Sequence, residues 1–238
     1  MIDFSSFKEM SIGGINLREL SINGTRVWVY QKTPDRLLPE GYIQLEYIEA
    51  TGTQYIDSGI TGHTGISVET NYMVLGLIGS NTTNGVIIGS SNSANQRMYI
   101  AVNKSASPFA WELGAGTYKV NSYKSQFNYK YKINVEWSTS TSNLVIDDKQ
   151  TGITNVATDF DNNTNMYILA RNKGGAQYFC HGRLYDMKIW DNDILIRDYI
   201  PVKYKDGTVG LYDFVTKTFF TNSGEGTFIA GPVMEEEK

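Results

Sequence analysis

Aromatic and polar side chains that could bind a sugar occur along the middle of the sequence. Exposed aromatic rings stack on pyranose faces, while amide and guanidinium groups hydrogen-bond to sugar hydroxyls. The candidate residues near expected loops are the aromatic residues Tyr99, Trp111, Tyr118, Tyr123 and Tyr178 together with Asn103, Arg171 and Asn172. The alternative is that these rings fill the core and pack across strands, which is the commoner fate of Tyr and Trp in a β-sandwich.

Carboxylates that could cleave a glycan are not arranged on one strand. A glycan hydrolase on a sheet would need carboxylates at alternate positions, so that they share a face. Asp191 and Asp193 have this spacing but fall in an expected turn, whereas Glu46 and Glu49 are three residues apart and face opposite ways. The run Glu235–Glu237 reads as a solvated tail. We therefore expect a protein that is not an enzyme.

The residues that could bind metal or act as a nucleophile are few. Cys180 and His181 are adjacent, so on a strand they point to opposite faces, and the only other histidine is His63. A buried, structural cysteine is the simpler interpretation. Asp159, Asp161 and Asn163 place oxygen atoms at alternate positions, as calcium loops do, but Ala170 stands where an EF-hand has its glutamate. We assign no metal and no cofactor, and leave cation binding by this loop open against an ordinary polar loop.

Composition limits the function classes. The 238 residues carry 21 Lys+Arg against 25 Asp+Glu, a net charge of -4, which offers no positive field for nucleic acid. A single cysteine excludes a disulfide within the chain. No apolar run reaches the length of a membrane span, and the N-terminus lacks the basic and apolar regions of a signal peptide. We expect synthesis in the cytoplasm and no membrane insertion.

Short alternating segments predict strands that bury one face. In Lys130–Trp137 the apolar residues Tyr131, Ile133, Val135 and Trp137 alternate with polar ones, and Trp137 is assigned to the core. Similar runs lie at 43–48, 67–74, 86–89, 97–102, 143–147, 166–170 and 183–190. With 23 Gly, 16 Tyr and no amphipathic helix of three turns, the sequence predicts an all-β, two-sheet antiparallel jelly-roll sandwich.

The first 33 residues form a separate expected module. Gly13-Gly14 and Asn23-Gly24 each separate two short alternating runs, which predicts a small β-hairpin meander. Residues 34–41 read as a linker, 42–232 as the sandwich and 233–238 as an acidic tail. A meander this small cannot bury both faces, so it either docks on the sandwich or assembles with another protein by strand pairing. The expected assembly residues are Ile15, Leu17, Val27, Trp28 and Val29.

Motifs near both ends of the sandwich resemble a known family. The segments are Leu45–Gly59, Gly182–Trp190, Arg197–Val202, Gly210–Asp213 and Gly224–Gly231. They are similar to laminin G-like, concanavalin A-like jelly-roll domains of phage and gut-bacterial surface proteins, over roughly residues 38 to 232. The N-terminal block resembles the short leader that precedes such domains in phage structural proteins. This resemblance implies a lectin-like sandwich that binds glycans or proteins, usually without catalysis.

These observations lead to one functional hypothesis with two alternatives. We expect a non-catalytic phage virion protein of the decoration or fibre type, made in the host cytoplasm and displayed on the virion surface. Its partners would be other virion proteins or its own copies as a homo-oligomer, and cell-surface glycans. The first alternative is a carbohydrate-binding lectin or adhesin module, and the second is a glycan hydrolase on the same fold.

Overall fold

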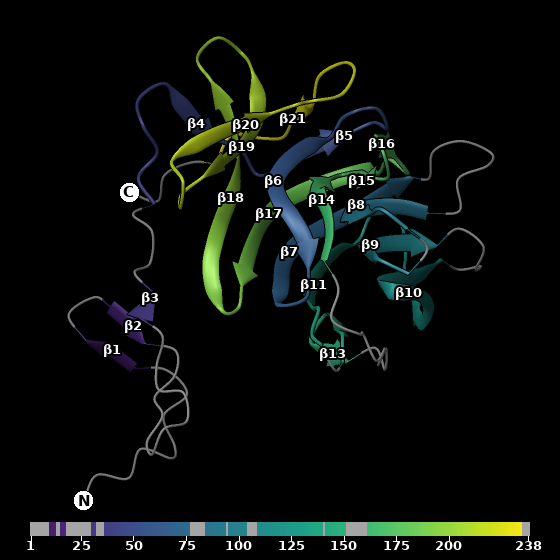
Figure 1. The fold of residues 1–238 in the computed structure, drawn as a ribbon. Coiled ribbons are helices and arrows are strands. Elements are labelled where there is room, and N and C mark those ends of the chain that lie inside the picture. Colours follow the sequence, from purple (N-terminus) through teal and green to yellow (C-terminus); the bar gives the residue numbers. More distant parts are fainter. Residues whose placement is uncertain are drawn as a thin grey trace, which may run out of the picture.

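The computed structural model describes residues 10–12, 15–17, 30–31, 36–76, 84–93, 95–103, 109–139, 141–150 and 161–234. Within these ranges the regular structure consists of β-strands, and helices are absent. Two large sheets pack face to face as a jelly-roll sandwich, which confirms the predicted fold class (Figure 1). No helix in the described part of the chain is long and apolar enough to cross a membrane.

The larger sheet has eleven strands among the described residues. Its main path runs β13-β12-β11-β7-β17-β18-β19-β20. Beside this path, β4 pairs with β18, β5 with β17, and β21 with β5. The strands are β4 (Tyr42–Gln44), β5 (Ile48–Ala50), β7 (Ile66–Gly76), β11 (Lys130–Glu136), β12 (Asn143–Ile146), β13 (Lys149–Gln150), β17 (His181–Asp191), β18 (Ile194–Tyr204), β19 (Val209–Asp213), β20 (Thr218–Thr221) and β21 (Ile229–Ala230). All their pairings are antiparallel.

The smaller sheet has seven strands in the described ranges and runs β10-β9-β8-β14-β6, with a short hairpin beside β8. Its strands are β6 (Ile56–His63), β8 (Asn84–Ser91), β9 (Arg97–Asn103), β10 (Ala110–Lys124), β14 (Asp161–Ile168), β15 (Arg171–Asn172) and β16 (Ala176–Gln177). The pairing of Asn172 with Ser90 is parallel, and the other pairings are antiparallel. This hairpin therefore extends the sheet next to β8.

Three short strands near the N-terminus form a sheet of their own. They are β1 (Met10–Ile12), β2 (Ile15–Leu17) and β3 (Tyr30–Gln31). Ile12 pairs with Ile15, so two residues separate β1 from β2, as a Gly13-Gly14 hairpin requires. The predicted hairpin at Asn23-Gly24 and the assembly residues Val27, Trp28 and Val29 lie outside the described residues. Ile15 and Leu17 lie on β2, and their proposed role in assembly stays a prediction.

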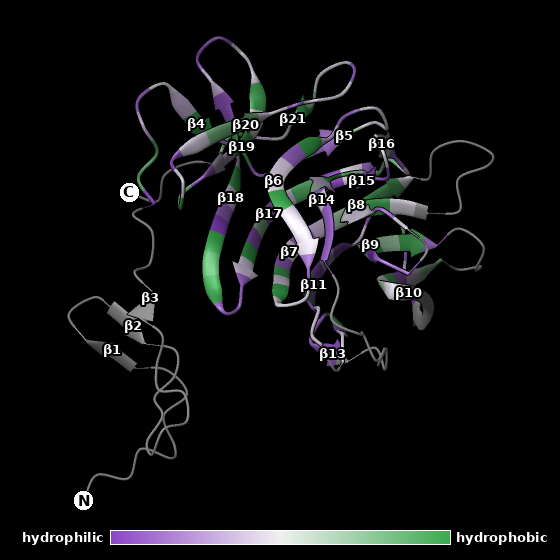
Figure 2. Cartoon of the chain, in the orientation of Figure 1, coloured by the Kyte–Doolittle hydropathy of each residue, from purple (hydrophilic) through white to green (hydrophobic). Residues whose placement is uncertain are grey.

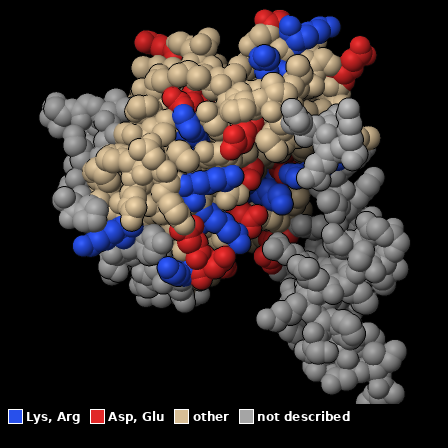
Figure 3. Space-filling view, turned by 180° about the vertical axis from the view of Figure 1, so that it is seen from behind, with Lys and Arg blue, Asp and Glu red and all other residues tan. Residues whose placement is uncertain are grey.

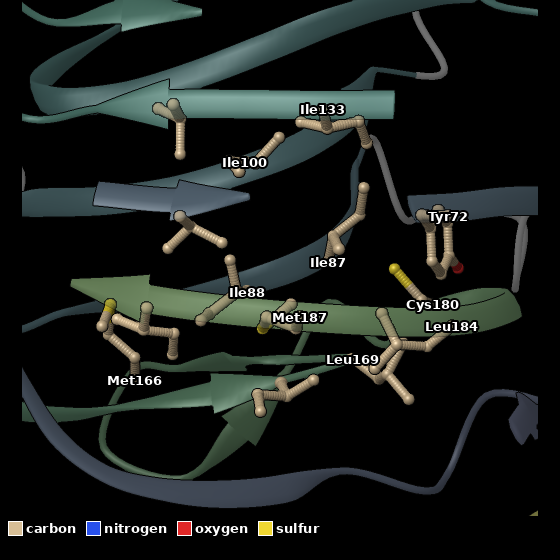
Figure 4. Packing of buried hydrophobic residues seen from close by; sticks show 14 of the residues in the cluster. Tyr72, Ile87, Ile88, Ile100, Ile133, Met166, Leu169, Cys180, Leu184 and Met187 are labelled. Carbon is tan, nitrogen blue, oxygen red and sulfur yellow. The ribbon is translucent and has the colours of Figure 1, made fainter. Parts of the chain in front are cut away.

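Alternation along the strands builds the core. On β7 the even-numbered residues from Ile66 to Val74 are buried and the odd-numbered ones are partly exposed. Figure 2 shows hydrophobic and hydrophilic residues interleaved along the strands in this way. In Figure 4, Ile133 and Met187 of the larger sheet meet Ile88 and Ile100 of the smaller one. The predicted core residue Trp137 is fully buried, and its indole Nε1 donates to the Gly114 carbonyl of β10 at 2.8 Å.

The linker is fastened to the sandwich by an ion pair. Arg36 donates from Nη2 to Asp198 Oδ1 at 2.6 Å and from Nε to Oδ2 at 3.2 Å, a two-point contact with a buried carboxylate on β18. The Pro39 carbonyl then accepts from the Tyr42 amide, which closes a turn before β4. The sandwich therefore begins to make contacts inside the predicted linker.

The family-like motifs of the C-terminal part hold turns in place. Asp213 at the end of β19 is fully buried, and its carboxylate accepts from the backbone amides of Asp198, Val215 and Thr216 and from the Thr216 hydroxyl. Near the first motif, the buried Gln54 side chain accepts from the Thr51 amide. These polar residues satisfy backbone groups that the turns leave unpaired.

The predicted runs 43–48 and 166–170 have different limits in the structure. The run 43–48 is divided into β4 and β5. Between them Leu45 forms an isolated bridge with Val233, while its amide still donates to the Pro201 carbonyl of β18. The run 166–170 ends at Ile168, since Leu169 adopts a φ of 68°. Leu169 still donates to the Ile87 carbonyl and accepts from the Cys180 amide, so the irregular residue remains hydrogen-bonded.

Candidate functional site

Four of the six predicted ligand-binding residues, Tyr99, Asn103, Arg171 and Tyr178, gather at the outer side of the smaller sheet. On β9, Met98, Ile100 and Val102 face the core, so the alternate residues face outward. Tyr99 and Asn103 lie on this outer side, and Arg171, Asn172 and Tyr178 come from the β15–β16 hairpin and the residues after it. We call Tyr99, Asn103, Glu112, Arg171 and Tyr178 the Arg171 cluster.

Glu112 is the member of the Arg171 cluster that the sequence analysis missed. It lies on β10, paired with Ala101, and is 1% exposed. The Tyr99 hydroxyl donates to Oε1 at 2.5 Å, and the Asn103 side-chain amide donates to Oε2 at 2.7 Å. Burial, followed by the Glu112 charge and hydrogen bond, raises the pKa of the Tyr99 hydroxyl well above its ordinary value. A sequence signal for it exists: Glu112 stands between the apolar residues Trp111 and Leu113, and this alternation places it on the outer side of the strand.

Arg171 lies between two tyrosine rings. Its guanidinium carbon is 4.0 Å from the Tyr178 ring centroid and 4.8 Å from that of Tyr99, which are cation–π distances. The Arg171 residue is 6% exposed. Tyr178 reaches this position with a φ of 56°, and its backbone carbonyl accepts from the Val86 amide. The Tyr99 ring lies directly over Gly114. A Cβ atom at position 114 would lie 2.5 Å from this ring, so position 114 requires glycine.

Asn172 organises the hairpin that carries Arg171. Its side-chain amide donates to the Asn165 carbonyl at 3.0 Å, and its oxygen accepts from the Gly175 amide at 3.3 Å. The turn residues Gly174 and Gly175 have positive φ angles and open space around them. Asn172 therefore positions the site, and the hairpin turn beside it projects into solvent.

Trp111 does not join this cluster. It lies on β10 one residue before Glu112, so its ring faces the opposite way, into the core. It is 0% exposed and meets the Tyr131 ring edge-on at 5.2 Å. Trp111 is therefore a core residue with no ring face for a ligand. Tyr99 is also buried, at 2% exposure, and contacts Arg171 instead of offering an open stacking face. The side chains of Tyr118 and Tyr123 lie outside the described residues.

The side chains considered for metal binding or catalysis make structural contacts instead. Asp161 Oδ1 accepts from the Asn163 amide at 2.8 Å, which closes a tight turn, and Asp159 is outside the described residues. Among the residues that the structure describes, no three His, Cys, Asp or Glu side chains gather as a metal site. Glu49 accepts from Arg183 at 2.8 Å. Cys180 is buried beside Tyr72, as Figure 4 shows, and burial raises the pKa of its thiol to about 12.

A second candidate site is a groove on the outer face of the larger sheet. It encloses about 220 Å³. Its lining comes from β7, β11, β12 and β17 and comprises Ser67, Val68, Glu69, Asn134, Val135, Glu136, Asn143, Val145 and Trp190. Figure 3, the view from behind, shows basic and acidic side chains interspersed on the molecular surface. The sequence analysis did not select these residues, because the groove arises only when four strands that are far apart in sequence pair.

Strand register places the groove residues in two rows. Trp190 and Glu136 both pair with Ser67, from opposite sides. In the next row, Lys188 and Asn134 both pair with Glu69. Glu69 and Glu136 are thus diagonal neighbours on adjacent strands, a relation in which Cα atoms lie about 7–8 Å apart. The groove therefore combines one aromatic ring with carboxylates and amides.

The comparisons with known proteins find similarity in the solved structures alone. No family model matches this chain, and no curated protein matches it. A solved structure similar to it is the crystal structure of a native heptameric SAP-like pentraxin from Limulus polyphemus. The two are 12% identical, the alignment covers 80% of this chain and 94% of that chain, and the TM-score is 0.48.

Proposed function

We propose that this chain is a non-catalytic carbohydrate-binding β-sandwich and that a short glycan segment binds in the groove of the larger sheet. The observation that supports this most directly is the lining of the groove. Trp190 is half-buried on its wall, and Asn134 and Asn143 provide amides on neighbouring strands. An aromatic surface with nearby amides and carboxylates is the combination that recognises a sugar by stacking and hydrogen bonds.

Strand positions make the groove rigid. Asn134 pairs with both Glu69 and Val145 in antiparallel ladders, so its backbone is held on two sides. Trp190 lies next to a bulge in the β17–β18 ladder, between Ile189 and Trp190. A bulge changes the direction of a side chain, and here it sets the wall of the groove. A preformed site of this kind loses little conformational entropy on binding.

A glycan hydrolase is the second candidate, and the diagonal pair Glu69 and Glu136 favours it. Glu136 is exposed, whereas the acid of a glycosidase works from a partly desolvated setting. Glu69 pairs across the strands with Lys188, so the side chain opposite it on β17 is basic. We therefore favour binding without turnover. Release of reducing sugar from a glycan panel by the wild-type protein, lost in Glu69→Gln and Glu136→Gln, would replace this proposal by hydrolysis.

The groove is tested by direct binding. The first experiment screens the full-length protein on a glycan array and measures the best hit by calorimetry. Trp190→Ala and Asn134→Ala should each weaken binding by 10-fold or more, because each removes a stacking or hydrogen-bonding group. Trp190→Phe keeps a ring and should lose less. Lys130→Ala, on the same face but outside the lining, is the matched control. Unchanged affinity in the folded Trp190 and Asn134 variants would refute the groove as the site.

We further propose that the protein is a phage virion component and that its N-terminal strands attach the sandwich to virion proteins or to its own copies. The described strands β1–β3 pair with one another, and none of them pairs with the two large sheets. A three-stranded sheet leaves edge strands that can accept a further strand. Mass-resolved sizing of the full-length chain beside a variant lacking residues 1–33 tests this. An oligomer that becomes a folded monomer supports assembly, and two monomers contradict self-assembly.

A further inference from the structure

Arg171 differs from three other arginines of the sandwich, each of which has a carboxylate partner. Arg36, Arg183 and Arg197 each have a carboxylate within 4 Å, at 2.6, 2.8 and 3.7 Å respectively. Arg171 is 6% exposed, yet no hydrogen bond or salt bridge joins its guanidinium to a described residue. Its guanidinium lies against the faces of Tyr99 and Tyr178. The arginine with the deepest burial among these four therefore lacks the anion that the others have.

An unpartnered, buried guanidinium is unfavourable in a folded protein. Removing its donors from water costs free energy that only hydrogen bonds to an anion return in full. The two tyrosine faces offset part of this cost by cation–π contact, but they accept no N–H bond in the guanidinium plane. The arrangement thus keeps the cation oriented while its donors remain available.

The free edge of the guanidinium faces outward. The Arg171 Nε atom is buried without a hydrogen-bond partner. The two terminal nitrogens also make no hydrogen bond to a described residue, but they are not among the fully buried atoms, so they retain contact with solvent. The turn of the hairpin that carries Arg171 is open, with no atom within 4 Å of a Cβ built on Gly174 or Gly175. A ligand group can therefore reach the terminal nitrogens from outside.

We propose that Arg171, clamped between Tyr99 and Tyr178, binds the carboxylate of an acidic sugar. A carboxylate is planar and matches the two parallel donors of a guanidinium edge. Its single charge also suits the neighbourhood, because the buried Glu112 carboxylate beside Tyr99 would repel the second charge of a phosphate. The turn at Gly174 leaves room for the sugar ring that carries the carboxylate.

This site is distinct from the groove and does not depend on it. Arg171 is beside the smaller sheet, and Trp190 and Glu69 lie on the outer face of the larger one. The sandwich core separates the two faces. Loss of binding at one site therefore leaves the other intact, so the two proposals fail separately.

The test is a titration of the full-length protein followed by NMR of arginine side-chain Nε–Hε signals. The probes are D-glucuronate, glucose as the neutral sugar, and acetate as the carboxylate alone. We expect saturable shifts of the Arg171 signal with glucuronate, weaker shifts with acetate and none with glucose. Arg171→Met should weaken glucuronate binding at least 10-fold, and Arg171→Lys should restore only part of it, because an ammonium lacks the paired donors.

Stability separates a binding role from a packing role. Arg171→Met keeps an unbranched side chain between the rings and removes an unpartnered buried cation, so its Tm should equal or exceed that of the wild type. Arg183→Met is the matched control: Arg183 lies 4.4 Å from the Tyr47 ring but also pairs with Glu49, so its loss should lower Tm. A Tm loss in Arg171→Met as large as in Arg183→Met would overturn the proposal. So would equal affinity for glucuronate and glucose or acetate, or glucuronate binding that survives in Arg171→Met.

Discussion

The two fully buried tryptophans of the core differ in one hydrogen bond. This difference predicts how much folding stability each loses when it is replaced by Phe. Trp111 and Trp137 are both 0% exposed. Trp137 donates its indole N–H to the Gly114 carbonyl at 2.8 Å and so joins the two sheets, whereas the Trp111 Nε1 is buried without a partner. Substitution of either by Phe removes the same volume and keeps an aromatic ring. The two substitutions differ only in whether the lost indole N–H had an acceptor.

The expected difference follows from these polar groups. Trp137→Phe removes the donor from a buried carbonyl, at a cost of about 1–3 kcal/mol, while Trp111→Phe removes an unpartnered N–H and relieves a penalty of similar size. Trp137→Phe should therefore be roughly 2–6 kcal/mol less stable than Trp111→Phe. For a domain of this size that is a Tm gap of at least about 4 °C. Urea and thermal unfolding followed by circular dichroism measure it.

Equal losses of stability in the two folded variants would refute this reasoning. That result would mean that the Trp137–Gly114 bond contributes nothing net, or that the Trp111 N–H finds an acceptor in solution. A larger loss in Trp111→Phe would reverse the assignment of the sheet-bridging role.

Three further predictions concern buried polar groups. Because the unfolded thiol titrates near pH 9 while burial keeps the pKa of Cys180 at about 12, stability should fall as pH rises from about 9 towards 12, and urea titrations should show a shallower fall in Cys180→Ala. Arg36→Ala leaves the buried Asp198 without its two-point partner and should cost about 1–3 kcal/mol in chemical unfolding; no loss would mean that the linker is not fastened there. Asp213→Asn retains two of four accepted bonds in either amide orientation and should cost about 3–6 kcal/mol, whereas an unchanged urea midpoint would contradict its role in the turn.

The sequence predicted the fold class well because alternation is a local signal. Lys130–Trp137 forms a strand with its apolar face inward, and the turn expected at Asp191–Asp193 has positive φ at Asn192 and Asp193. The boundaries were less predictable where a tertiary contact overrides the pattern. Leu45, between β4 and β5, forms a bridge with Val233, which is 188 positions away in sequence, and no local signal encodes such a partner.

For the candidate sites, residue type could be read from the sequence, whereas the direction of each side chain and its distant neighbours could not. Tyr99, Arg171 and Tyr178 were selected by residue type, and the structure brings them together at cation–π distances. Trp111 was selected by type as well, but it faces the core, because strand phase decides exposure and residue type does not. The groove residues Glu69 and Glu136 are 67 positions apart and become neighbours only through the β7–β11 register, which the sequence does not reveal.

The ion pair between Arg36 and Asp198 also joins the linker to β18, so a force applied through the linker would reach the sandwich at this strand. Both the linker and the last described residues leave from the β4 edge, where the Met234 amide donates to the Gln44 carbonyl. Trp190 in the groove pairs with Leu195, and Gln44 pairs with Val202, so seven residues of β18, roughly 24 Å, separate the two points. If a ligand bound in the groove were pulled away from the linker, the force would act along β18. It would load the hydrogen bonds to β17 and β19 in shear, all at once, instead of unzipping them one by one.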